Sequence, residues 1–122
     1  MSVRRIFSGG PYEDVIGYCR AVIAPPFVLV SGCTSVDSDD PREQALAGFR
    51  VAERALVEAG CSLADVVRTR MYLRDITDAG AVGAAHAELF EAVRPAASMI
   101  AVTGFIDPRM RVEVEVDAYL PL

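Results

Sequence analysis

Hydrophobic and polar residues alternate most regularly near the C-terminal end of the chain. Val112, Val114 and Val116 are separated by Glu113 and Glu115. Because successive side chains of a β-strand point to opposite faces of a sheet, this pattern predicts a strand over residues 110–119 with one apolar face.

A second alternating segment spans residues 63–73 and predicts another strand with a single buried face. Its apolar face would carry Val67, Thr69, Met71 and Leu73, and its polar face Arg68, Arg70, Tyr72 and Arg74. With Glu113, Glu115 and Asp117, these polar side chains would form the other face of the sheet. That face would be solvated in a monomer, or would become a polar interior of paired charges in an oligomer.

Two segments show helical periodicity. The first begins near Pro41, after a cluster of turn and acidic residues, and ends at Gly60; its apolar stripe is Ala45, Phe49, Ala52, Leu56 and Ala59. The second is predicted to run from a cap at Thr77 or Asp78 to about Val93, and its buried side is Val82, Ala85, Leu89 and Val93.

Shorter runs complete the predicted fold. Residues 15–31 contain two β-compatible runs, GYCRAVI and FVLVSG, separated by Pro25 and Pro26, which favour a connection because proline lacks an N–H donor. Further strands are expected near residues 3–7 and 98–103. The order β-β-β-α-β-α-β-β predicts an α+β fold in which residues 1–122 form one domain, with two helices on one face of a sheet.

Composition favours self-association and argues against a nucleic-acid partner. Hydrophobic residues make up 52% of the 122 residues, which suggests apolar surface left over for oligomerisation. A net charge of −5 does not suit phosphate binding. No apolar run approaches the roughly 20 residues that span a bilayer, and MSVRRIFSGG lacks the apolar core of a signal peptide, so a cytoplasmic protein without a membrane partner is expected.

Candidate reactive side chains are few. Cys19, Cys33 and Cys61 show no paired spacing, so reduced thiols are expected, and a single histidine, His86, argues against a multi-histidine metal site. Cys33 directly follows Ser31 and Gly32 and could lie at the mouth of a cleft, but the sequence offers no basic neighbour that would activate its thiol. Packing is the favoured interpretation of His86, at the edge of an apolar stripe.

Several segments together resemble the Rid family, also called YjgF or RidA and often labelled endoribonuclease L-PSP or translation initiation inhibitor. They are Tyr18, FVLVSG, AERALVEAGCSLADVVRTRMYLRD and RVEVEVDAYL, and the most specific part is GCSLADVVRTRMYLRDI. The resemblance covers nearly the whole chain. It implies a chorismate-mutase-like fold, a homotrimer with clefts between subunits, no cofactor, and hydrolysis of reactive enamines and imines to 2-oxo acids and ammonia.

The resemblance also implies a set of site residues. In the family's deaminases a glutamate holds the attacking water, and a tyrosine, a serine and an asparagine line the cleft. Carried over by position, the glutamate is Glu113, the tyrosine is Tyr18, and the serine is Ser31, followed by Gly32. The asparagine is replaced by Gly83.

A further departure removes a charge. Where those deaminases have an arginine that binds the substrate carboxylate, then serine and a cysteine that contributes its backbone N–H, this chain has Ala97, Ser98 and Met99. Losing a charge-assisted bond that contributes roughly 1.5–3 kcal/mol, and more when shielded from water, would weaken binding of a 2-imino acid about tenfold to several hundredfold. Met99 keeps a backbone N–H, so the cleft would be more apolar and less cationic.

Two other arginines are candidate replacements for the missing cation. Arg20 lies two residues after Tyr18, so alternation along a strand would place both side chains on one face. Arg94 is the second candidate, although a residue in such a connection is usually solvated. The alternative interpretation of Arg20 is a surface or interface ion pair with an acidic residue such as Glu113 or Glu115.

The sequence therefore predicts a Rid-like hydrolase or deaminase acting on a small imine, enamine or related carbonyl metabolite, with Glu113 as the catalytic carboxylate. The alternative is a trimer that binds a small metabolite without turnover. An L-PSP-type endoribonuclease is disfavoured by the acidic charge balance. No metal or cofactor is indicated.

Overall fold

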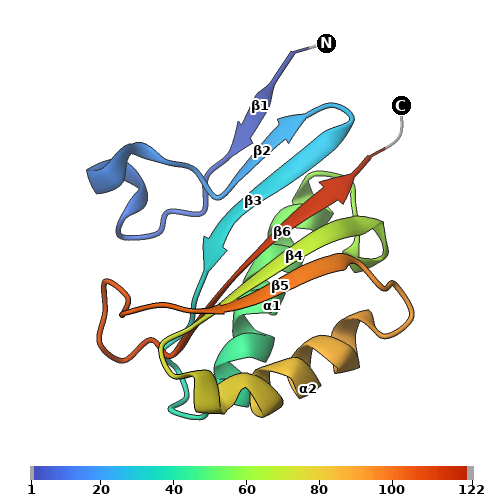
Figure 1. Cartoon of the computed structure of the whole chain (residues 1–122). Coiled ribbons are helices and arrows are strands. Elements are labelled where there is room, and N and C mark those ends of the chain that lie inside the picture. The colour runs from blue at the N-terminus through green and yellow to red at the C-terminus, as the bar shows by residue number, and fades with distance from the viewer. Residues whose placement is uncertain (1, 121–122) are drawn as a thin grey trace.

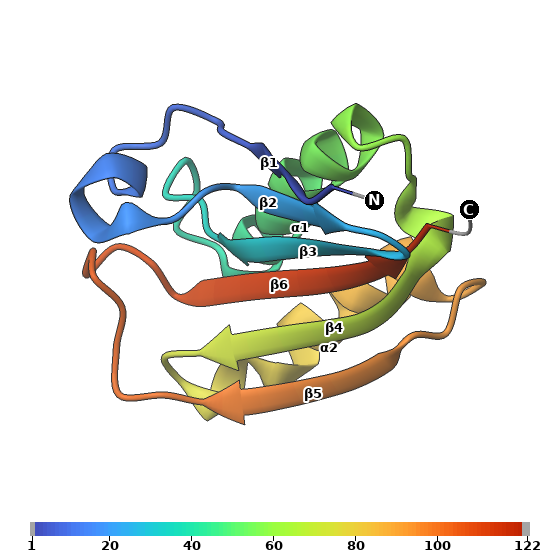
Figure 2. The ribbon, with the colours of Figure 1, turned by 90° about the horizontal axis from the view of Figure 1, so that it is seen from above.

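The computed structural model describes residues 2–120, so the predicted domain of residues 1–122 extends beyond them at both ends. Six strands form one sheet in the order β1-β2-β3-β6-β4-β5, and the helices α1 and α2 cover one of its faces (Figures 1 and 2). This arrangement confirms the predicted α+β fold and element order. The elements are β1 Arg4–Ile6, β2 Ala21–Ala24, β3 Phe27–Cys33, α1 Pro41–Glu58, β4 Val66–Leu73, α2 Ala79–Phe90, β5 Ala96–Ala101 and β6 Val112–Tyr119.

Helix α1 forms where the sequence predicts it. The Asp40 side chain accepts a hydrogen bond from the Arg42 N–H at the start of the helix, and Pro41 occupies the first turn. The chain leaves the helix through Gly60, whose φ of +89° favours glycine. Within residues 2–120, no helix is long and apolar enough to cross a membrane.

The core lies between the helices and the covered face of the sheet. The predicted alternation in β6 is confirmed, because Val112, Val114 and Val116 are all buried on that face. Phe49 of α1 packs against Phe90 of α2 with ring centroids 5.2 Å apart. This contact between two fully buried rings joins the helices over the sheet.

Helix α2 is shorter than predicted. It ends at Phe90, and the following turn closes at Arg94, whose φ is +57°. Val82 and Ala85 are buried as expected, while Leu89 and Val93 are only half-buried. Phe90 takes the core position instead, because the chain must turn there into β5, which begins at Ala96 rather than at Ser98.

The first predicted hairpin strand is partly wrong. Pro25 and Pro26 do connect β2 and β3, but β2 begins only at Ala21. Glu13–Gly17 forms a wide helical turn instead of extended chain. Its cause is a carboxylate contact: Glu13 accepts hydrogen bonds from the N–H groups of Ser8 (3.1 Å) and Gly10 (2.7 Å), which folds the preceding loop onto the turn.

The predicted start of the central strand is also wrong. Residues 63–65 form a short helical turn, and β4 begins at Val66. The pairing with β6 shifts register between Val66 and Arg68, so Val66 is buried and Val67 is 45% exposed. The predicted alternation holds from Thr69 onward, because a bulge moves the earlier side chains by one position.

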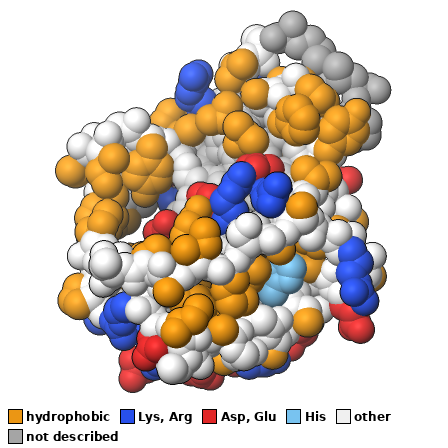
Figure 3. Space-filling view, in the orientation of Figure 1, with side chains coloured by type: hydrophobic (Ala, Val, Ile, Leu, Met, Phe, Trp, Pro, Cys, Tyr) orange, Lys and Arg blue, Asp and Glu red, His pale blue; other side chains and the backbone are white. Residues whose placement is uncertain are grey.

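The uncovered face of the sheet combines charged and apolar side chains (Figure 3). Arg70 lies 3.2 Å from Asp117 and 3.6 Å from Glu115, and the Tyr72 hydroxyl donates to Glu115 at 2.7 Å. Large apolar side chains remain exposed on β3, β5 and β6, including Phe27, Leu29, Ile100 and Tyr119. A lone subunit would therefore leave much apolar area in water.

Candidate functional site

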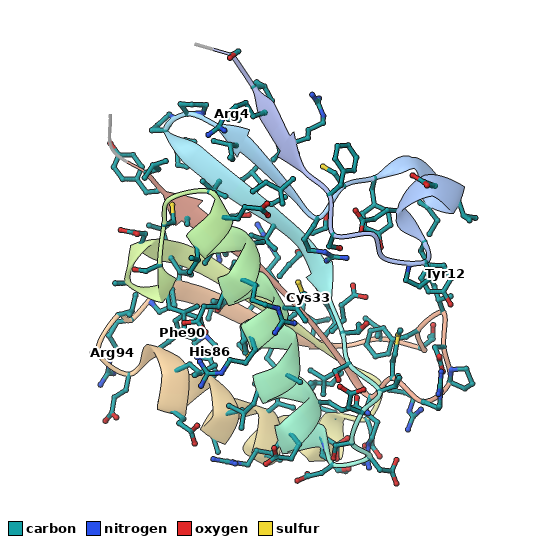
Figure 4. The ribbon with its side chains drawn as sticks, turned by 180° about the vertical axis from the view of Figure 1, so that it is seen from behind. Arg4, Tyr12, Cys33, His86, Phe90 and Arg94 are labelled. Carbon is teal, nitrogen blue, oxygen red and sulfur yellow. The ribbon has the colours of Figure 1, made fainter. Side chains whose placement is uncertain are left out.

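A pocket of about 280 Å³ opens at the end of β3. It lies between the loop that precedes the Glu13–Gly17 turn and the segment that leads into β6, and it appears as the hollow at the left of Figure 3. In Figure 4, Tyr12 marks the loop side and Cys33 the end of β3. Among the predicted site residues, Tyr18, Arg20, Gly32 and Glu113 line this pocket.

Glu113 is held over a glycine in the pocket wall. The pairing of β3 with β6 shifts register between Val30 and Cys33, and Gly32 lies within this bulge. A Cβ on Gly32 would come within 2.6 Å of Oε2 of Glu113. Only a glycine leaves the Glu113 carboxylate room in this position.

The surroundings of Glu113 favour its protonated form. Burial raises the pKa of its carboxyl above the usual range, and the nearby Glu115 charge raises it further, while Arg20 acts in the opposite direction. A carboxyl with a raised pKa can accept and return a proton closer to neutral pH. Glu113 can therefore serve as a general acid or base.

Arg20 enters the pocket from beneath the Tyr18 ring. The prediction that both residues lie on a strand is wrong, because β2 starts only at Ala21. They nevertheless meet: the guanidinium carbon of Arg20 is 5.7 Å from the centre of the Tyr18 ring. Arg20 donates to the carbonyl oxygen of Gly32 at 2.7 Å, so it also stabilises the bulge that carries Glu113.

Cys33 lines the pocket, whereas Ser31 does not. The Ser31 hydroxyl donates to the Cys19 carbonyl oxygen at 2.7 Å and does not line the pocket with Glu113. The Cys33 thiol is buried, which raises its pKa to about 11. The thiol therefore stays protonated near neutral pH and is a poor nucleophile.

The remaining predicted residues are on the opposite edge of the sheet. Ala97, Ser98 and Met99 belong to β5, which β6 and β4 separate from β3. Three strand spacings correspond to roughly 14 Å, so within one chain these three β5 residues do not reach the pocket. A Cβ on Gly83 would lie 3.9 Å from the terminal methyl of Met99, so these two departures from the family pattern are neighbours.

His86 and Arg94 are also away from the pocket, on α2 and in the turn after it (Figure 4). His86 Nε2 lies 2.8 Å from the Thr69 hydroxyl, and its ring packs against Phe90 at 4.7 Å. Burial lowers the pKa of His86. Arg94 is exposed and its Nε donates to the Glu91 carbonyl oxygen.

The residue that sequence reasoning missed is Glu13. Its buried carboxylate also accepts from the Ser8 hydroxyl, and these hydrogen bonds lower its pKa. It shapes the loop that closes one side of the pocket. The neighbouring Gly9-Gly10 pair signalled a turn, but no local pattern indicated that a carboxylate three residues later would anchor it.

Comparison with known proteins identifies the family. The model of the family described as Endoribonuclease L-PSP matches residues 12–120. The chain belongs to this family. The resemblance to Rid and YjgF proteins seen in the sequence is thereby confirmed.

Relatives in several organisms resemble this chain over most of its length. An uncharacterized protein of Streptomyces coelicolor is 44% identical over 97% of this chain and 92% of that protein. The crystal structure of a YjgF/YER057c/UK114 family member from Mycobacterium tuberculosis, also 44% identical, superposes with a TM-score of 0.94 over 98% of this chain and all of that one. The human 2-iminobutanoate/2-iminopropanoate deaminase is 29% identical over 93% of this chain and 88% of the human protein.

Proposed function

We propose that this protein is a hydrolase or deaminase of small imines, enamines or related carbonyl metabolites, with its sites in clefts between the subunits of a homotrimer. The observation that carries the proposal is the Glu113 carboxylate, partly desolvated and held over Gly32 in a small pocket. A volume of about 280 Å³ is just below the usual range of roughly 300–1,000 Å³ for ligand pockets, which suits a small metabolite.

The chemistry needs few groups. Water adds to the carbon of the C=N bond while Glu113 accepts one of its protons and passes it to the nitrogen, which gives a carbinolamine. Glu113 then accepts the hydroxyl proton of the carbinolamine and delivers it to the nitrogen as the C–N bond breaks, so ammonia leaves and the carbonyl forms. One imine and one water thus give one carbonyl compound and one ammonia. Developing charge would be stabilised by backbone N–H groups on the free edge of β5, near Met99.

Assembly would complete the site. The pocket is at one end of β3, whereas Ala97, Ser98 and Met99 lie on the far edge of the sheet. A neighbouring subunit that supplied its β5 would bring the two walls together. The exposed apolar side chains of the uncovered face support such packing, because burying them is favourable.

Substrate preference would differ from that of an arginine-bearing deaminase. The human relative is named for 2-iminobutanoate and 2-iminopropanoate. With Ala97 on β5, that wall supplies no guanidinium for a ligand carboxylate. Efficient deamination of such acids by the family's usual geometry is therefore not expected.

Two other functions are weaker alternatives. A trimer that binds a metabolite without turnover would use the same pocket and would not need the proton transfer by Glu113. Endoribonuclease activity is suggested by the family's name alone, and the net charge of −5 opposes binding to RNA phosphates.

The test is ammonia release from freshly generated imines. An amino-acid oxidase supplies 2-iminobutanoate from 2-aminobutanoate, and a flavin-dependent amine oxidase supplies imines without a carboxylate from simple amines. The decay of each imine is followed with and without the protein. The proposal predicts a rate above the uncatalysed rate for at least one imine. A protein that binds such ligands but never exceeds the uncatalysed rate would be a binding module.

A further inference from the structure

Arg20 is a buried cation without a carboxylate partner. Its side chain is only 8% exposed, yet within residues 2–120 it makes no ion pair shorter than 4.0 Å. The predicted alternative, an ion pair with Glu113 or Glu115, is therefore wrong for the single chain. An unpaired buried charge is costly, so proteins rarely keep one without a use.

The hydrogen bonds of Arg20 leave part of its guanidinium free. Nη1 donates to the carbonyl oxygens of Gly32 and Ser31 and contacts the Cys33 sulfur at 3.4 Å. Nε is sealed from solvent and has no partner in the described part of the chain. Nη2 makes no hydrogen bond there and is not sealed, so it is open to the cavities that Arg20 borders, which are the candidate pocket and the neighbouring cavity.

Within residues 2–120, none of the nearby carboxylates forms an ion pair with Arg20. Glu13 is held by Ser8 and Gly10, and Glu115 by Tyr72 and Arg70. Glu113 is close enough for Arg20 to influence it electrostatically but does not contact the guanidinium. The charge of Arg20 is thus available to a ligand.

We infer that Arg20, through its unpartnered Nη2, binds the carboxylate of a ligand in this pocket, and so moves the anion-binding cation from the β5 wall to the wall that carries Glu113. This inference rests on the pocket of the proposed function and names its substrate class, a small metabolite with one carboxylate. A singly charged group fits better than a phosphate, because Glu113 shares the pocket and would repel a dianion.

The arrangement also positions the ligand. Arg20 lies under the Tyr18 ring and is fixed by the Gly32 carbonyl oxygen, and a Cβ on that glycine would touch Glu113. A carboxylate held by Arg20 therefore places the neighbouring imine or carbonyl carbon beside the Glu113 carboxylate. A rigid, charge-assisted contact of this kind fixes orientation as well as affinity.

The experiment measures binding rather than turnover. Calorimetric titration compares 2-oxobutanoate with its neutral analogue 2-oxobutanamide on the wild type and on Arg20→Gln, Arg20→Lys and Arg54→Gln. Arg54 is the matched control, because it is an exposed arginine on α1 that borders the neighbouring cavity but not this pocket. Melting curves establish that each variant is folded.

The wild type and Arg54→Gln are expected to prefer the carboxylate by about tenfold or more, and Arg20→Gln to lose that preference. Arg20→Lys keeps the charge but not the planar fork, so it retains part of the preference. Equal affinity of the wild type for acid and amide would overturn the inference, even if Arg20→Gln failed to fold. An unchanged preference in Arg20→Gln would do the same.

Failure of the proposed function is a separate result. A protein that shows the Arg20-dependent preference but hydrolyses no imine contradicts the proposed function and supports the inference. A protein that hydrolyses neutral imines and binds 2-oxobutanoate equally well with and without Arg20 supports the function and contradicts the inference.

Discussion

Replacing Glu113 with Gln is expected to lower kcat for imine hydrolysis by at least about 100-fold, because removing a positioned general base typically costs a factor of 10²–10⁴. The amide keeps the size of the side chain above Gly32 but cannot accept the proton of the attacking water. Single-turnover measurement of ammonia release separates this chemical step from product release. KM should change much less than kcat.

Glu115→Gln is the matched control for this variant. Glu115 is on the same face of β6, two residues away, and accepts from the Tyr72 hydroxyl instead of lining the pocket. Its replacement removes the same charge but only lessens the rise in the pKa of Glu113, so kcat should fall far less than in Glu113→Gln. Equal losses in the two variants would mean that net charge, and not the Glu113 carboxylate, limits the rate.

The stability of Glu113→Gln gives a second control with a defined sign. Burial raises the pKa of Glu113 in the folded protein above its unfolded value, so the folded state holds its proton more tightly. The folded protein therefore loses stability as pH rises from the unfolded-state pKa of Glu113 through its folded-state pKa. Above the folded-state pKa, the buried ionised carboxylate lowers the free energy of unfolding. Thermal melting should show the Gln variant as stable as the wild type or more so at pH 8, with the difference shrinking toward about pH 4.

Replacing Ala97 with Arg is expected to raise kcat/KM for 2-imino acids by about tenfold to several hundredfold, because it restores a guanidinium on the wall where the family's deaminases have one. Ala97 is exposed on an edge strand, so a longer side chain should not disturb folding. The gain should be larger in the Arg20→Gln background, where the ligand carboxylate has lost its cation.

A neutral imine is the control substrate for Ala97→Arg, since its hydrolysis should not respond to the new charge. The measurement compares steady-state rates of Ala97→Arg and the wild type on both substrates, and light scattering follows the oligomeric state. A correctly assembled variant that gained nothing on 2-imino acids would show that the cleft has diverged at more positions than this one.

The regular elements of the fold were predictable because their signals are local. Alternation about Val114 identified β6, and the spacing of Ala45, Phe49, Ala52 and Leu56 identified α1; all of these residues are buried. When one face of a helix or strand is buried, apolar residues recur along the sequence with the period of that element. The spacing of apolar residues therefore indicates which face is buried.

The irregular parts were not predictable, because long-range contacts decide them. The bulge that exposes Val67 depends on pairing with β6, nearly 50 residues away in the chain. The turn at Glu13–Gly17 depends on amides of an earlier loop, and Phe90 reaches the core only because α2 ends there. No local period records these contacts.

The candidate site shows the same division. Position within a motif suggested Tyr18, Gly32 and Glu113, and the structure places all three around one pocket. The same reasoning also assigned Ser31 to the pocket, although its hydroxyl donates to the Cys19 carbonyl oxygen instead. It did not show that Arg20 donates to backbone oxygens and not to a carboxylate. Those outcomes depend on which partner each polar group reaches after folding.

The most direct test of the central claim, that each site is completed by a second subunit, is complementation between two inactive variants. Glu113→Gln disables the pocket wall, and Ser98→Arg is designed to block the β5 wall. After the two are unfolded and refolded together in equal amounts, random assembly in a ring would give about a quarter of the sites both intact walls. The account predicts that about this fraction of wild-type ammonia release returns in the mixture, whereas no recovery in correctly assembled mixed oligomers would contradict it.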